Sequence, residues 1–84
     1  MSKPILLLLD DDKELRDSFK LEFEDQGFMV FAGARSADLE PTDLAVATHA
    51  LVDMRMDRET GIEAIKKIRA INIVKILNFK LKLF

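Results

Sequence analysis

An unbroken apolar run followed directly by three aspartates constrains the fold of this chain more than any other feature. The run covers residues 5–9, and Asp10, Asp11 and Asp12 follow it. Five residues are too few for a stable helix, and a short continuous apolar run is typical of a strand buried on both faces, as in a parallel sheet. The sequence therefore predicts a central strand whose carboxyl end carries several acidic groups.

Strand-like and helix-like segments alternate after this run. Two further predicted strands cover residues 28–31 and 49–53, and the second of them ends in Asp53. A helix is expected to begin at Asp11 and Asp12, because Glu14 follows the first of them by three positions, as in a capping box.

The helices are predicted from apolar residues that recur every three or four positions. The first helix should stop at Gly27, because glycine commonly ends helices. A short second helix should begin near Pro41, since proline is tolerated in the first turn. The apolar stripes of the first and third helices are Leu15, Phe19 and Phe23, and Ile62, Ile65 and Ile68.

The order of these segments predicts an α/β fold. Alternating strands and helices imply right-handed crossovers and a flavodoxin-like parallel sheet with helices on its faces. A fourth strand is expected near residues 73–77, and no segment remains for a fifth, so the fold is incomplete, with about three to four strands and three helices. The 84 residues form a single small domain.

The predicted sheet brings acidic residues from two strands to one edge. In the flavodoxin-like strand order 2-1-3, the first and third strands are neighbours, and ligands bind outside their carboxyl ends. Asp10 and Asp11 end the first strand and Asp53 ends the third. Three carboxylates in one place repel one another unless a cation or a proton relieves the repulsion. Oxygen ligands without histidine or cysteine favour a hard ion such as Mg²⁺.

These motifs resemble the receiver domains of response regulators in two-component signalling. Residues 5–12, ILLLLDDD, are similar to the first strand and acidic pair of receivers, and residues 50–56, ALVDMRM, are similar to the strand and loop around the phosphorylated aspartate. Gly61 stands eight residues after Asp53, as receivers commonly have it. The resemblance covers about residues 3–71. Residues 72–84 diverge, so we expect a partial receiver domain from a truncated or frame-shifted gene product.

The resemblance implies a role for each acidic residue. Asp53 would accept a phosphoryl group from a phosphohistidine on a sensor histidine kinase, forming an aspartyl phosphate. Mg²⁺ would be held by Asp10, Asp11, Asp53 and the backbone carbonyl of Arg55. The chain would then be a cytoplasmic phosphoprotein of a phosphorelay, a phosphoacceptor in signal transduction and not a turnover enzyme.

The sequence also departs from the receiver pattern. Asp57 stands where receivers usually have proline. We find no Ser or Thr after the expected fourth strand and no lysine after a fifth, because Lys80 and Lys82 lie in a different context. A site that works by electrostatics would then lack one cation that faces the phosphoryl group.

Two other functions and one purely structural explanation stay open at this stage. The Asp10-x-Asp12 pair superficially fits the nucleophile motif of metal-dependent phosphatase-type enzymes, although Lys13 and Glu14 do not continue it. A non-catalytic interaction fragment would occupy the partner kinase or self-associate through the unfinished edge of its sheet. The aspartates would also serve as a helix cap, but capping does not explain an acid at the end of the third strand.

Composition excludes several classes of protein. There is no cysteine, so neither a disulfide framework nor a thiolate zinc site is possible. No segment has the features of a secretory signal or a membrane span, and no membrane association is expected. All acidic residues lie at or before Glu63, and the later segment is basic. Its basic residues alternate with apolar ones, which indicates a solvated face and no direct nucleic-acid binding.

Overall fold

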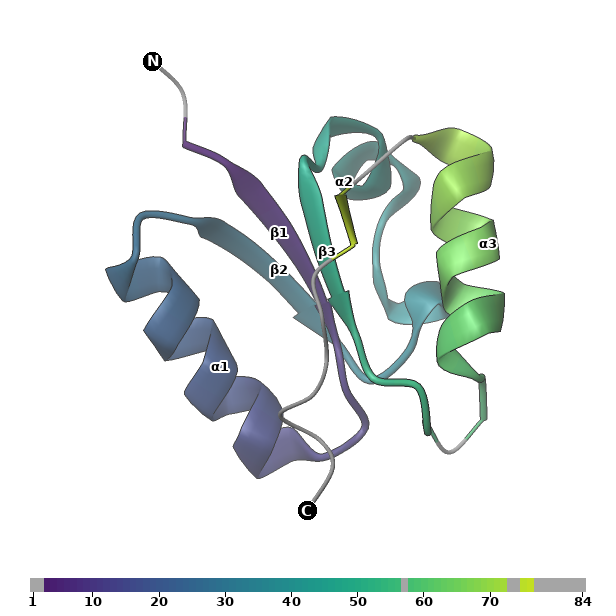
Figure 1. Ribbon diagram of the computed structural model, residues 1–84, viewed down its shortest axis with the longest axis horizontal. Helices are drawn as coiled ribbons and strands as arrows, with labels where there is room; N and C mark the ends of the chain where they lie inside the picture. Colours follow the sequence, from purple (N-terminus) through teal and green to yellow (C-terminus); the bar gives the residue numbers. More distant parts are fainter. Residues whose placement is uncertain (1–2, 57, 73–74, 77–84) are drawn as a thin grey trace.

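The computed structural model describes residues 3–56, 58–72 and 75–76 as one parallel sheet with helices on both faces (Figure 1). The strand order is β2-β1-β3-β4, which confirms the predicted flavodoxin-like order 2-1-3. The strands are β1 (Ile5–Leu9), β2 (Met29–Gly33), β3 (His49–Val52) and β4 (Lys75–Ile76). The helices are α1 (Lys13–Asp25), α2 (Pro41–Val46) and α3 (Gly61–Ile71), with a 3₁₀ turn η1 (Ser36–Asp38) before α2.

Strand β1 is buried on both faces, as its apolar run predicts. Leu6 and Leu8 point to the face covered by α1, where they pack in a cluster with Phe19 and Phe23. The alternate residues of β1 point to the opposite face, which is covered by α2 and α3. This alternation follows from the two-residue period of a strand. Strand β1 therefore lies between the two layers of helices in Figure 1.

Helix α1 begins one residue later than the sequence suggests. Asp12 is the N-cap, and its carboxylate accepts a hydrogen bond from the backbone N–H of Leu15 at 3.1 Å. The predicted pairing of Asp11 with Glu14 is therefore wrong, since Asp11 lies outside the helix. The predicted stop at Gly27 is confirmed, because this residue has a φ of 97°, which glycine adopts without steric cost.

Helix α3 is held at its start by a capping box that the sequence analysis overlooked. The Thr60 hydroxyl accepts the Glu63 N–H at 3.1 Å, and the Glu63 carboxylate accepts the Thr60 N–H at 3.0 Å. The predicted apolar stripe is only partly right. Ile68 is fully buried, but Ile62 is 60% exposed. Ala64 takes a place in the buried face of the helix instead.

Some predictions concern residues outside the described ranges. The fourth strand is confirmed at Lys75–Ile76, which pairs with β3, whereas residues 73, 74 and 77 lie outside the described part of the chain. Asp57 and the basic residues of the tail, Lys80 and Lys82, also lie outside it. Within the described residues, no helix combines the length and the apolar composition needed to cross a membrane.

The two isoleucines of α3 provide a matched test of this packing. Ile68→Ala should lower the free energy of unfolding by about 2–5 kcal/mol, because it leaves a cavity in the core. Ile62→Ala should change it by less than about 0.5 kcal/mol, because that side chain is largely in water. Urea denaturation of both variants measures the difference. Equal losses for the two substitutions would contradict the orientation of α3.

Candidate functional site

Two strand ends define the site. Strands β1 and β3 are parallel neighbours, and Leu9 pairs with Val52 at their carboxyl ends. The backbone pairing extends one residue further, because the Asp53 N–H donates to the carbonyl oxygen of Leu9 at 2.8 Å. On the other side, the Asp10 N–H donates to the carbonyl oxygen of Gly33 at 3.1 Å. The backbones of Asp10 and Asp53 are therefore fixed by the sheet itself.

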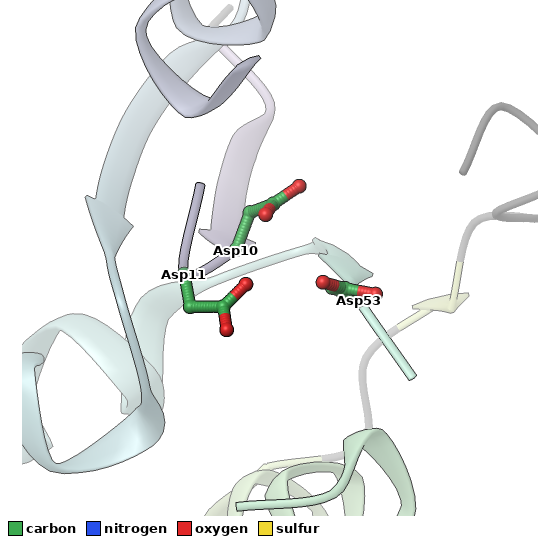
Figure 2. A group of neighbouring side chains, drawn as sticks. All are labelled: Asp10, Asp11 and Asp53. Atoms are coloured by element: carbon green, nitrogen blue, oxygen red, sulfur yellow. The ribbon is translucent and has the colours of Figure 1, made fainter. Parts of the chain in front are cut away.

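Three carboxylates converge at this edge of the sheet. Figure 2 shows Asp10 and Asp11 on the loop that follows β1, and Asp53 on the loop that follows β3. One carboxylate oxygen from each residue can be chosen so that all three atoms lie within 4.8 Å of one another. Asp10 and Asp53 are buried and Asp11 is exposed. The structure thus brings together the three acids that the sequence grouped, with Asp11 open to solvent.

Both buried aspartates are oriented by the same local motif. The Asp10 carboxylate accepts the Asp12 N–H at 2.9 Å, and the Asp53 carboxylate accepts the Arg55 N–H at 3.0 Å. Each is an Asx turn, in which an aspartate binds the backbone two residues further on. The Arg16 guanidinium also donates to the carbonyl oxygen of Asp10 at 2.7 Å. The two Asx turns therefore orient the carboxylates of Asp10 and Asp53, while Arg16 holds the backbone of Asp10.

The donor set fits a divalent cation of the hard class. Carboxylate oxygens are the ligands that Mg²⁺ prefers. Asp10, Asp11 and Asp53 each offer one such oxygen, and the group contains no histidine or cysteine. A cation would also relieve the mutual repulsion of three negative charges. The predicted contribution of the Arg55 carbonyl stays a prediction.

Asp12 does not join the acidic cluster. Its carboxylate caps α1, and the group of three contains Asp11 in its place. This arrangement disfavours a phosphatase-type motif, which requires Asp10 and Asp12 to act together. Helix capping therefore does not account for Asp10 and Asp11, because Asp12 alone caps the helix.

A buried glutamate that the sequence analysis overlooked ties two loops together. Glu59 is 6% exposed, and its carboxylate accepts the Ser36 N–H at 2.8 Å and the Ser36 hydroxyl at 2.6 Å. The Lys67 ammonium lies 2.9 Å from the same carboxylate. Ser36 follows β2, and Glu59 lies in the loop between β3 and α3. No sequence signal marks this contact, because the two residues are 23 positions apart.

These partners lower the pKa of Glu59. Burial alone would raise the pKa of a carboxyl group, because it disfavours the charged form. The hydrogen bonds from Ser36 and the nearby Lys67 ammonium outweigh burial and hold the pKa below its ordinary value of 4.5. Glu59 is therefore a charged, fully partnered group with a structural role.

Gly61 allows a close approach at the carboxyl end of β3. A Cβ atom at this position would lie 2.7 Å from the Cα of Met54 and 2.8 Å from the carbonyl oxygen of Asp53. Gly61 also donates its N–H to the carbonyl oxygen of Met54 at 3.2 Å. Gly61 thus lets the start of α3 lie against Met54, the residue that follows Asp53. Met56 is buried in the core, but Met54 is 44% exposed.

Comparison with known proteins identifies the fold. No protein-family model and no curated protein matches the sequence. The similar solved structures include receiver domains from Clostridium thermocellum (20% identity, TM-score 0.75) and Methylobacillus flagellatus (CheY-like; 20% identity, TM-score 0.77). They also include the receiver domain of the Francisella response regulator 1452 (25% identity, TM-score 0.66). They cover 87%, 89% and 80% of this chain, which spans 63%, 67% and 56% of theirs. The chain therefore has the fold of response-regulator receiver domains.

The close approach at Gly61 predicts a specific loss of stability. Gly61→Ala should lower the free energy of unfolding by about 1–3 kcal/mol, because backbone atoms of Met54 and Asp53, as well as the Met54 side chain, oppose the new methyl group. The amide resonances of Asp53 and Met54 should also shift. Ser18→Ala, on the exposed face of α1, is the control and should be near neutral. If Gly61→Ala leaves both the free energy of unfolding and these resonances unchanged, the close contact at Gly61 is wrong.

The Glu59 contact predicts a dependence of stability on acid. Because the Glu59 pKa is lower in the folded chain than its ordinary value of 4.5, the stability from this group is complete above about pH 4.5. That stability is lost as the pH falls through the folded pKa. Glu59→Gln should therefore lower the free energy of unfolding by about 1–3 kcal/mol near neutral pH. The stability of this variant should also decline less in acid than that of the original chain.

Urea midpoints measured across the acid range check this expectation. Glu24→Gln on α1 removes an exposed carboxylate and should keep the acid dependence of the original chain. If Glu59→Gln shows the same decline in acid as the original chain, the stabilising role of the Glu59 charge is wrong.

Proposed function

We propose that this chain is a phosphorelay receiver, in which Asp53 accepts a phosphoryl group from a phosphohistidine on a partner sensor histidine kinase. The convergence of Asp10, Asp11 and Asp53 at the carboxyl end of a parallel sheet is the observation that carries the proposal. The likeness to receiver domains supports it, because those domains share this fold. The proposal assigns the chain a role in two-component signal transduction.

The chemistry is a direct transfer to a carboxylate. A carboxylate oxygen of Asp53 attacks phosphorus, and the phosphorus–nitrogen bond of the phosphohistidine breaks. The electron pair leaves with the imidazole nitrogen, which takes up a proton from water. The product is an aspartyl phosphate. The Asx turn at Arg55 orients the Asp53 carboxylate for this attack.

The same site would hold Mg²⁺. Asp10, Asp11 and Asp53 supply carboxylate oxygens, and the backbone carbonyl of Arg55 is the proposed fourth ligand. When bound, the ion neutralises negative charge on the carboxylates and on the transferred phosphoryl group. Each chain accepts one phosphoryl group, so the proposed role is that of a phosphoacceptor and not of a turnover enzyme.

Intact mass spectrometry tests this function. After incubation with Mg²⁺ and acetyl phosphate, the original chain should gain the mass of one phosphoryl group. Asp53→Asn should gain none, because an amide cannot form the anhydride. Asp25→Asn, at the exposed end of α1, is the matched control and should react like the original chain.

Two further samples complete the experiment. Omission of Mg²⁺ should abolish the gain, and circular dichroism should show that every variant is folded. A gain of mass by folded Asp53→Asn would assign the acceptor elsewhere. A gain that is lost in Asp10→Asn but kept in Asp53→Asn would support the phosphatase-type alternative.

A further inference from the structure

A pocket of about 290 Å³ lies beside the acidic cluster. It is lined by Asp11, Ala34, Arg35, Asp38 and Arg58. These residues come from the three loops that follow β1, β2 and β3, so the pocket opens at the same end of the sheet as the cluster. Asp11 belongs to both the pocket and the cluster. A ligand in the pocket would therefore lie next to the proposed cation.

The charges around the pocket are unequally partnered. One Asp38 oxygen accepts the Ala34 N–H at 3.0 Å, and the other lies 3.9 Å from Nε of Arg35. Asp38 is thus held by its own loop and offsets the charge of Arg35. Arg58 is exposed, and within the described part of the chain no carboxylate lies within 4.0 Å of its guanidinium nitrogens.

The balance changes when Asp11 holds a cation. Two aspartates and two arginines line the pocket, so its side chains sum to zero charge when Asp11 faces only solvent. A divalent ion held by Asp10, Asp11 and Asp53 reduces their combined charge from −3 to −1, so Asp11 then offsets less of the positive charge of Arg58. Guanidinium groups bind phosphate oxygens through paired N–H donors.

We propose that Arg58, with Arg35 beside it, binds the phosphoryl oxygens of the phosphodonor once Asp11 holds its cation. This inference rests on the proposed function and adds a donor-binding residue to it. Arg58 would supply positive charge on the side of the site that faces the β2–α2 loop. The ligand class is a phosphate monoanion or dianion, or a phosphorylated donor that presents the same oxygens.

Binding of inorganic phosphate tests the inference without any phosphoryl transfer. Titrations followed by amide chemical shifts should show binding that is tighter with Mg²⁺ than without it. Arg58→Ala should weaken the affinity measured with Mg²⁺ about tenfold, the effect expected for loss of a charged hydrogen bond. The phosphate affinity of Arg58→Lys should lie between those of the original chain and Arg58→Ala, because lysine keeps the charge but loses the paired donors. Arg69→Ala, in the last turn of α3, is the matched control.

The same variants are then tested with acetyl phosphate. Arg58→Ala should need about tenfold more donor for the same rate of mass gain. If the original chain gains no phosphoryl mass, the proposed function fails. If the original chain reacts, but Arg58→Ala binds phosphate and reacts as Arg69→Ala does, the proposed function stands and the inference about Arg58 is overturned.

Discussion

Burial of β1 on both faces is the constraint on which the rest of this structure depends. Leu6, Leu7, Leu8 and Leu9 are all fully buried, and helices from both layers pack on them. A strand buried in this way must be central, so it pairs with β2 on one side and with β3 on the other. Parallel pairing with β3 then places Asp10 and Asp53 side by side. The site is a consequence of how the core is built.

Buried carboxylates serve two different purposes in this small domain, and their partners distinguish them. Glu59 is satisfied by Ser36 and Lys67, and these contacts stabilise its negative charge. Asp10 and Asp53 form a group of three carboxylates with Asp11 at the carboxyl end of the sheet. Glu59 therefore holds two loops together, while the aspartates form a site whose repulsion a cation would relieve. The first arrangement stabilises the structure and the second prepares it for a ligand.

The loops around the acids are positioned by contacts outside the cluster. Gly61 lets the start of α3 lie against Met54, directly after Asp53. Glu59 links this same loop to Ser36, which follows β2. Arg58 precedes Glu59, so the contact that holds the loop also holds the backbone of Arg58 beside the pocket. The proposed donor-binding side of the site thus depends on a structural ion pair.

The order of strands and helices and the group of Asp10, Asp11 and Asp53 could both be predicted from the amino-acid sequence. These features follow from local patterns: an apolar run, stripes with helical spacing, and acids placed directly after strands. The tertiary structure was needed to show that Asp12 caps α1, that Ile62 is exposed and that Glu59 binds Ser36. Such outcomes depend on the paths of loops and on distances between residues far apart in the chain, which no local pattern encodes. The pocket at Arg35 and Arg58 has the same origin, because three loops must meet to form it.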